Sequence, residues 1–131
     1  MPGQSLVMLN RRWFTFSVET VNGVPQATSE SPGSDELFIV DSIVLSTNPP
    51  TPVTCTLYHD NASPQRYIDA SLVTPADTFE GSLEIPSGSV LLLVWSGITG
   101  TPVLSARMHY TRYQIVPVST DSTLRDWRGP R

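Results

Sequence analysis

Apolar and polar residues alternate along much of this chain of 131 residues, and a period of two is typical of strands with one buried face. The clearest alternation runs through 78–85, where Phe79, Gly81, Leu83 and Ile85 are expected to face a core. No segment has a sustained helical period. The same criteria predict about eight strands, at 13–18, 24–28, 37–46, 53–59, 67–73, 78–85, 89–95 and 103–116.

Turn-forming residues separate most of these segments at intervals of about 8–12 residues, the spacing of sandwiches and barrels. Asn22-Gly23 predicts a hairpin turn because both residues tolerate positive φ. The segment Asn48–Pro52 ends a strand because proline cannot donate to a ladder. We therefore predict an all-β fold, an antiparallel β-sandwich of jelly-roll type with Greek-key connections.

The segment Leu37–Ser46 is apolar on both faces except at Asp41 and Ser42. This pattern predicts a central strand that is covered on both sides, with a bulge at the polar pair. An alternative role for Asp41 is an ion pair with Arg107 or Arg112, across the sheet or across an interface.

The chain is long enough for one domain, and we divide it into three parts. Residues 1–12 are predicted to be an N-terminal arm, 13–116 the β-sandwich domain and 117–131 a C-terminal arm. Within the C-terminal arm, Leu124 and Trp127 are three residues apart and would share one face of a helical turn. This end is either frayed or an arm whose Leu/Trp pair fills a pocket of a neighbouring subunit.

The net charge of −4 has the wrong sign for a protein that binds phosphates without sequence preference, so no nucleic-acid partner is expected. All eight basic residues are arginines, which suit bidentate ion pairs at interfaces, although host codon bias would give the same composition. Five of the eight lie in the predicted arms: Arg11, Arg12, Arg125, Arg128 and Arg131. The arms of one protomer are therefore expected to pair with the more acidic sandwich of another.

No segment is apolar enough to predict a membrane partner. The longest apolar run, Val90–Trp95, is far shorter than the roughly 20 residues of a membrane-spanning helix. The first twelve residues show no secretory signal. We expect a soluble protein that is synthesised in a cytoplasm.

Few residues offer catalytic chemistry. A lone Cys55 in an alternating strand is expected to be a buried small hydrophobe. His59 and His109 lack further ligands at metal-binding spacing. Glu80 and Glu84 would lie about 13 Å apart on one strand, too far for glycoside hydrolysis. We expect no catalytic residues, no metal, no cofactor and no enzymatic activity.

Three segments carry a resemblance to a known class of proteins: the strands Leu37–Ser46 and Val53–His59, and the hairpin Phe79–Trp95. Their layout resembles the small β-sandwich structural proteins of tailed bacteriophages, including capsid decoration (cement) proteins, fibres and tail adaptors. The resemblance implies a virion protein on the capsid surface. It would assemble with itself, typically as a homotrimer, and brace the major capsid protein or other virion subunits.

Two alternatives stay open: a phage tail or adaptor component, and a carbohydrate- or receptor-binding module. The second would use outward aromatic side chains as a stacking platform, and the candidates are Trp13, Tyr58, Trp95 and Tyr113. For the structural role, the residues expected to bind partners are arginines and large apolar residues of the two predicted arms, together with the first residue of the predicted sandwich. They are Arg11, Arg12, Trp13, Leu124, Arg125, Trp127 and Arg128.

Overall fold

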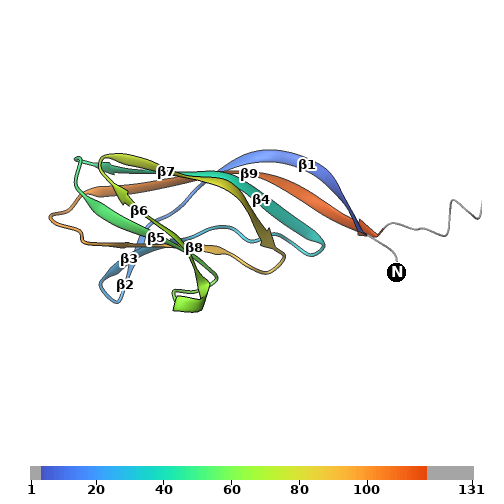
Figure 1. The fold of residues 1–131 in the computed structure, drawn as a ribbon, viewed down its shortest axis with the longest axis horizontal. Coiled ribbons are helices and arrows are strands. Elements are labelled where there is room, and N and C mark those ends of the chain that lie inside the picture. Colours follow the sequence, from blue (N-terminus) through green and yellow to red (C-terminus); the bar gives the residue numbers. More distant parts are fainter. Residues whose placement is uncertain (1–3, 118–131) are drawn as a thin grey trace, which may run out of the picture.

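The computed structural model describes residues 4–117, which form two antiparallel β-sheets packed face to face (Figure 1). The strands are β1 (Gln4–Thr15), β2 (Glu19–Val21), β3 (Val24–Thr28), β4 (Glu36–Asn48), β5 (Val53–His59), β6 (Tyr67–Val73), β7 (Ala76–Pro86), β8 (Leu91–Ser96) and β9 (Val103–Pro117). One short 3-10 helix, η1 (Pro64–Arg66), precedes β6. The four-stranded sheet has the order β1-β9-β4-β7 and the five-stranded sheet β2-β3-β8-β5-β6. The predicted antiparallel β-sandwich is confirmed.

The strands are connected as a jelly roll. Four antiparallel pairs are nested in the sequence: β1 with β9, β3 with β8, β4 with β7, and β5 with β6. This nesting is that of one long hairpin, and the lateral pairs β4–β9 and β5–β8 close it into a roll. The predicted jelly-roll topology is therefore confirmed.

The hydrophobic core lies between the two sheets. On β9 the side chains of Ala106, Met108 and Tyr110 are buried, as the alternation predicts. Trp95 of β8 is the largest fully buried side chain. Burial of a large apolar side chain contributes about 1.5–3 kcal/mol to stability. Cys55 is fully buried, as predicted, and burial raises the pKa of its thiol to about 12.

The described residues contain nine strands where the sequence predicts about eight. The additional strand is β2, which forms a hairpin with β3 around Asn22-Gly23. Asn22 has φ 52° and Gly23 has φ 79°, so the turn uses the positive φ values for which these residues were singled out. The predicted bounds of β3, β5 and β6 agree with the structure.

The first strand begins nine residues before its predicted start, which corrects the division of the chain. Residues 4–12 were assigned to an N-terminal arm, but they form most of β1 and pair with β9 from Gln4 opposite Pro117 onward. Figure 1 shows the paired ends of β1 and β9 reaching beyond the other strands. The segment escaped prediction because Leu6–Leu9 has no alternation. Residues 118–131 lie outside the described part of the chain.

A β-bulge interrupts β4 at Asp41, as predicted for the polar pair in this strand. On one side, Val40 and Ser42 pair with adjacent residues of β9, so Asp41 is the extra residue. On the other side, the two residues Gly81 and Ser82 of β7 stand opposite Asp41. The bulge therefore affects both neighbours of β4 at the same level of the sheet.

Candidate interaction surface

An aromatic and charged cluster lies on the outer face of the four-stranded sheet, the face turned away from the five-stranded sheet. Trp13 of β1 is 50% exposed and pairs across the strands with His109 of β9, with ring centroids 4.8 Å apart. The guanidinium carbon of Arg107 lies 4.4 Å from the centroid of the Trp13 ring. A cation over an indole face is attracted by the ring quadrupole, so Arg107 and His109 together hold the indole in place.

Asp41 extends this cluster across the sheet. Its Oδ2 atom lies 2.8 Å from Nδ1 of His109. A carboxylate only accepts, so Nδ1 of His109 carries the proton and donates it. Within the chain, the alternative pairing of Asp41 with Arg107 or Arg112 across the sheet is wrong, because the bulge at Asp41 places its side chain beside His109.

Arg112 instead joins three strands on the inner face. Its guanidinium donates to Glu36 of β4, with Nη2 3.2 Å from Oε2, and to Oδ1 of Asn10 in β1 at 3.3 Å. About a quarter of the Arg112 and Glu36 side chains is exposed, so this ion pair is partly shielded from water. It fixes β1 to the rest of the sheet beyond the last core residues.

The free edge of β1 carries four consecutive exposed apolar residues. Leu6, Val7, Met8 and Leu9 are 46%, 46%, 56% and 42% exposed. Among the described residues β1 pairs only with β9, so its other edge presents unpaired backbone donors and acceptors. An exposed apolar edge strand is a template for pairing with another chain.

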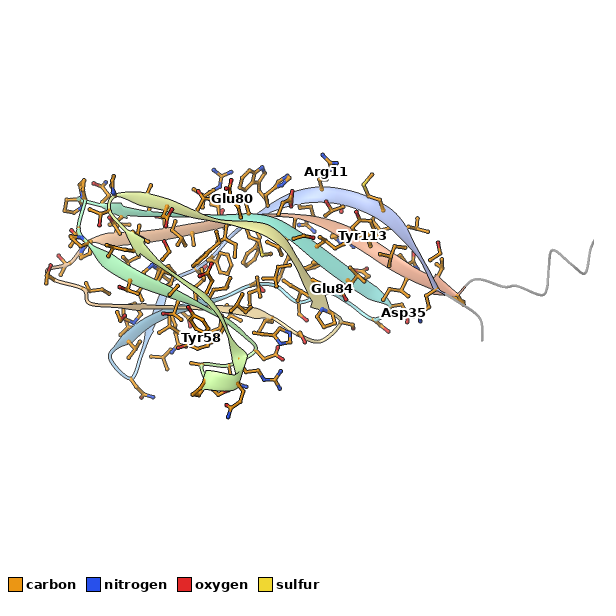
Figure 2. All side chains as sticks on the ribbon, viewed as in Figure 1. Arg11, Asp35, Tyr58, Glu80, Glu84 and Tyr113 are labelled. Atoms are coloured by element: carbon orange, nitrogen blue, oxygen red, sulfur yellow. The ribbon has the colours of Figure 1, made fainter. Side chains whose placement is uncertain are left out.

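Charge is divided across the same outer face. Arg11 and Arg107 lie on the β1 and β9 side, whereas Glu80 and Glu84 lie on β7 at the opposite edge. Figure 2 shows Arg11 and Glu80 projecting from β1 and β7 respectively. The two edges of this sheet therefore have complementary charges, which favours contact between copies or with a polar partner.

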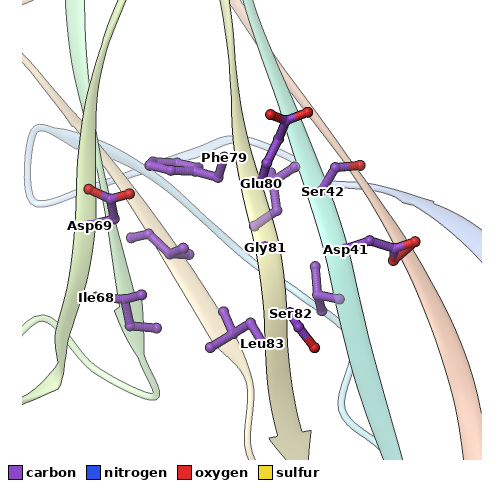
Figure 3. A pocket seen from close by; sticks show the side chains of 12 residues that line it. Asp41, Ser42, Ile68, Asp69, Phe79, Glu80, Gly81, Ser82 and Leu83 are labelled. Atoms are coloured by element: carbon purple, nitrogen blue, oxygen red, sulfur yellow. The ribbon is translucent and has the colours of Figure 1, made fainter.

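A second feature is a cavity between the edges of the two sheets, with a volume of about 280 Å³. Its apolar wall comes from β4, β5, β6 and β7, and its mouth is polar (Figure 3). The lining residues are Val40, Asp41, Ser42, Ile43, Leu57, Ile68, Asp69, Phe79, Glu80, Gly81, Ser82 and Leu83.

The structure separates the residues that were predicted to bind partners. Arg11 and Trp13 share the outer face of β1, whereas Arg12 pairs with Tyr110 and lies on the opposite face. The four predicted residues of the C-terminal arm lie outside the described residues: Leu124, Arg125, Trp127 and Arg128. Sequence reasoning missed the roles of Arg107, His109 and the apolar edge, although the run of four apolar residues near the N-terminus was a visible signal.

The four aromatic residues proposed as a stacking platform are not brought together. Trp95 is 1% exposed because its strand is central and its register places it opposite the buried Cys55, so its outward assignment is wrong. Tyr58 lies in the five-stranded sheet, where its ring is 6.4 Å from that of Tyr67. Trp13 and Tyr113 share the outer face of the other sheet.

Within residues 4–117, no three His, Cys, Asp or Glu side chains are grouped so as to hold a metal ion. Over the same range, no helix is long and apolar enough to cross a membrane.

No family model matches this chain, and no curated protein sequence matches it significantly. Among solved structures, a chain of the extra small virus (XSV) VLP of the giant freshwater prawn Macrobrachium rosenbergii aligns at 11% identity with a TM-score of 0.45. That alignment covers 85% of this chain and 79% of the other. A chain of the infectious bursal disease virus Gt strain aligns at 10% identity with a TM-score of 0.21, covering 92% of this chain and 42% of the other. With TM-scores below 0.5, these alignments leave function to be argued from the residues themselves.

Proposed function

We propose that this chain is a non-enzymatic structural protein of a virus particle. In the finer form of the proposal, it is a capsid decoration or cement protein. It associates with itself, with a trimer favoured, and braces neighbouring capsid subunits. The observation that carries the proposal is the exposed apolar edge of β1 at Leu6–Leu9.

In a monomer, exposure of these apolar side chains to water is unfavourable and brings a risk of aggregation. Burial of each of the four side chains in an interface would contribute about 1.5–3 kcal/mol before the costs of association. An added strand would also satisfy the free backbone groups of β1, which is the mode of recognition called β-augmentation. A subunit that builds a lattice through its sheet edge has a use for both properties.

The fold is compatible with this role without deciding it. Jelly rolls occur in viral capsid proteins and also in lectins and cupins, so the topology supports a short set of functions. The three segments that carry the bacteriophage resemblance supply β5 and most of β4, β7 and β8, and these strands are divided between the two sheets of the sandwich. The edge of β1 is what favours the structural role within that set.

Trp13 gives the proposed interface an anchor. Tryptophan and arginine are enriched at binding hot spots, and here a half-exposed indole is held between Arg107 and His109. The cluster lies on the same strand as the apolar edge. A partner that pairs with β1 would therefore also contact the indole from the side of the outer face.

The test is the solution mass of the full chain by light scattering coupled to size exclusion, followed by co-sedimentation with capsids that lack it. A discrete oligomer, three times the 14.4 kDa chain mass in the favoured case, and stoichiometric capsid binding are expected. A monomer that does not sediment with capsids would contradict the proposal.

A second candidate is a carbohydrate- or receptor-binding module, and the Trp13 cluster is the observation that favours it. An exposed indole flanked by Arg107, His109 and Asp41 offers a stacking face with hydrogen-bonding groups beside it. A monomeric chain whose Trp13 fluorescence changes on titration with glycans would favour this candidate. Trp13→Phe, which removes that signal, is the matched control.

A further inference from the structure

The cavity between β6 and β7 has a mixed chemistry that suits one kind of side chain. Its wall is apolar, with Ile68 of β6 and Phe79 and Leu83 of β7 turned toward the space between the strands (Figure 3). Asp69 and Glu80 are exposed at its mouth. Asp41 also lines the cavity, but its carboxylate already accepts from His109. An apolar or aromatic group flanked by cations would satisfy both the wall and the mouth.

The space exists because of the bulge in β7. Gly81 has φ +148°, a conformation that favours glycine, and an added Cβ would meet no atom within 4 Å. The missing side chain and the extra residue of the bulge leave the two sheet edges apart at this level. Since an apolar cavity of roughly 150 Å³ can hold a benzene molecule, the volume of about 280 Å³ has room for an indole.

The C-terminal segment Leu124–Arg128 has the matching composition. It reads Leu-Arg-Asp-Trp-Arg, so Trp127 stands directly before Arg128 and two residues after Arg125. The last fourteen residues carry three arginines and two aspartates, whereas residues 1–117 carry five arginines and ten acidic residues. Tail and body therefore attract one another electrostatically.

The direction of β9 favours insertion of the C-terminal tail into the cavity of a neighbouring copy. The strand passes the cavity level near Tyr110, and Pro117 lies about 23 Å further along it at a strand rise of ~3.3 Å. The ten residues from Pro117 to Trp127 extend at most about 33–36 Å. To enter its own cavity the tail would have to reverse and run back along the sheet. To enter a copy beyond the tip it continues in the direction of β9.

We propose that the cavity between β6 and β7 is the docking site for Trp127 in the C-terminal tail of a second copy of this chain. The indole fills the apolar space, and Arg125 and Arg128 pair with Asp69 and Glu80. This inference rests on the proposed function, because it supplies a contact between copies in the assembled state. It uses a surface separate from the β1 edge.

A mixed cross-link tests the contact directly. Full-length ¹⁵N-labelled Ser82→Cys protein is mixed with unlabelled Thr123→Cys protein and oxidised mildly. Ser96→Cys, at an exposed position at the end of β8, replaces Ser82→Cys as the matched control. The native Cys55 is fully buried and its thiol stays protonated at neutral pH, so it does not take part. Mass spectrometry of the disulfide-linked dimers shows from the isotope label which copies are joined.

The expected product is a mixed-isotope dimer that forms at least ten times faster with Ser82→Cys than with Ser96→Cys. Equal rates for the two partners would overturn the proposal. A double variant with both Ser82→Cys and Thr123→Cys that closes only within one chain would also overturn it, since the tail would then occupy its own cavity.

A second measurement separates this inference from the proposed function. Trp127→Ala and the pair Asp69→Arg/Glu80→Arg should each raise the dissociation constant of the oligomer at least tenfold, measured by analytical ultracentrifugation. Combining them should add little, because both remove the same contact. Glu19→Arg, at an exposed position on β2 of the other sheet and outside the cavity lining, is the control.

The pattern of losses distinguishes the two ideas. If charge substitutions in the β1 edge dissociate the oligomer while Trp127→Ala leaves it intact, the docking site is refuted and the proposed function stands. If Trp127→Ala dissociates it while the β1 edge substitutions do not, the tail contact stands and the β1 edge is not the interface.

Discussion

The two edges of the four-stranded sheet differ in the charge and the apolar character of their side chains, two properties that govern pairing with another strand. The β7 edge carries Asp77, Glu80 and Glu84, a bulge at Gly81 and a terminal Pro86. Charges, bulges and prolines are the features by which natural sheets prevent edge-to-edge association. The β1 edge has no charge and no proline between Leu6 and Leu9, although it too has a bulge, at Leu9.

This difference shows that the two edges of the sheet are built differently. A need for solubility alone would favour charged residues on both edges, so it does not explain the apolar β1 edge. One edge carries several charges that oppose pairing, while the other combines free backbone groups with exposed apolar side chains on both faces of the strand.

The largest effect is expected from placing charge in the apolar edge. Leu6→Lys/Met8→Lys removes two side chains that would each contribute about 1.5–3 kcal/mol on burial, so the dissociation constant of the oligomer should rise at least ~100-fold. Light scattering and ultracentrifugation measure it. Leu72→Lys, at a position 66% exposed on β6, should leave the mass unchanged. An intact oligomer in the double variant would show that β1 is not the interface.

The next effect concerns the indole beside that edge. Trp13→Ala should weaken association by about 2–4 kcal/mol if the cluster with Arg107 and His109 is an anchor. Stability to urea should change little, because the side chain is half exposed in the monomer. Tyr67→Ala, at a similarly exposed aromatic position in the other sheet, is the comparison. Equal losses of affinity in the two variants would exclude a specific role for Trp13.

A smaller effect is expected from releasing β1 from its neighbours. Arg112→Ala removes the hydrogen bonds to Glu36 and Asn10 and should lower the free energy of unfolding by about 1–3 kcal/mol. Amide exchange in residues 4–10 should quicken more than exchange in the core. Arg66→Ala, which removes a guanidinium 4.0 Å from Asp60 on the surface, should cost less than about 0.5 kcal/mol. Uniform exchange along β1 would contradict this role.

The smallest effect lies on the β7 side and depends on pH. A hydrogen bond from the Ser71 hydroxyl, together with the backbone N–H of Thr78, lowers the pKa of Asp77 below 3.8. The carboxylate therefore contributes stability above pH 3.8, and that contribution is lost as pH falls through the lowered pKa. Urea midpoints of the wild type and Asp77→Asn should differ at pH 7, and the difference should shrink as the pH falls below 3.8. A difference independent of pH would contradict this assignment.

Much of the sandwich could be predicted from the sequence because turn chemistry and alternation agree there. β3, β5 and β6 are flanked by Gly, Pro or Asn residues that leave little choice of boundary. The bulge at Asp41 was visible as a polar residue in an apolar strand. These features depend on neighbours in the sequence.

The parts that could not be predicted depend on neighbours in space. Alternation presupposes one buried face, so the β1 segment Leu6–Leu9, which buries neither face, showed no alternation in its sequence. The face of Trp95 could not be read from a strand that is apolar throughout. The pairing of Asp41 with His109, 68 residues later, is set by strand register across the sheet.

The nested pairing of the strands also determines when during translation β1 can pair with β9. β1 is translated first and its partner β9 last, and 87 residues lie between Thr15, the end of β1, and Val103, the start of β9. At roughly 5–20 residues per second, the ribosome needs about 4–17 s to synthesise this intervening segment before β9 begins. The outer edge of β1 becomes an ordered template only once β9 has docked on the other side. Incomplete chains therefore present no ordered β1 edge, and assembly through this edge is restricted to subunits whose translation has passed β9.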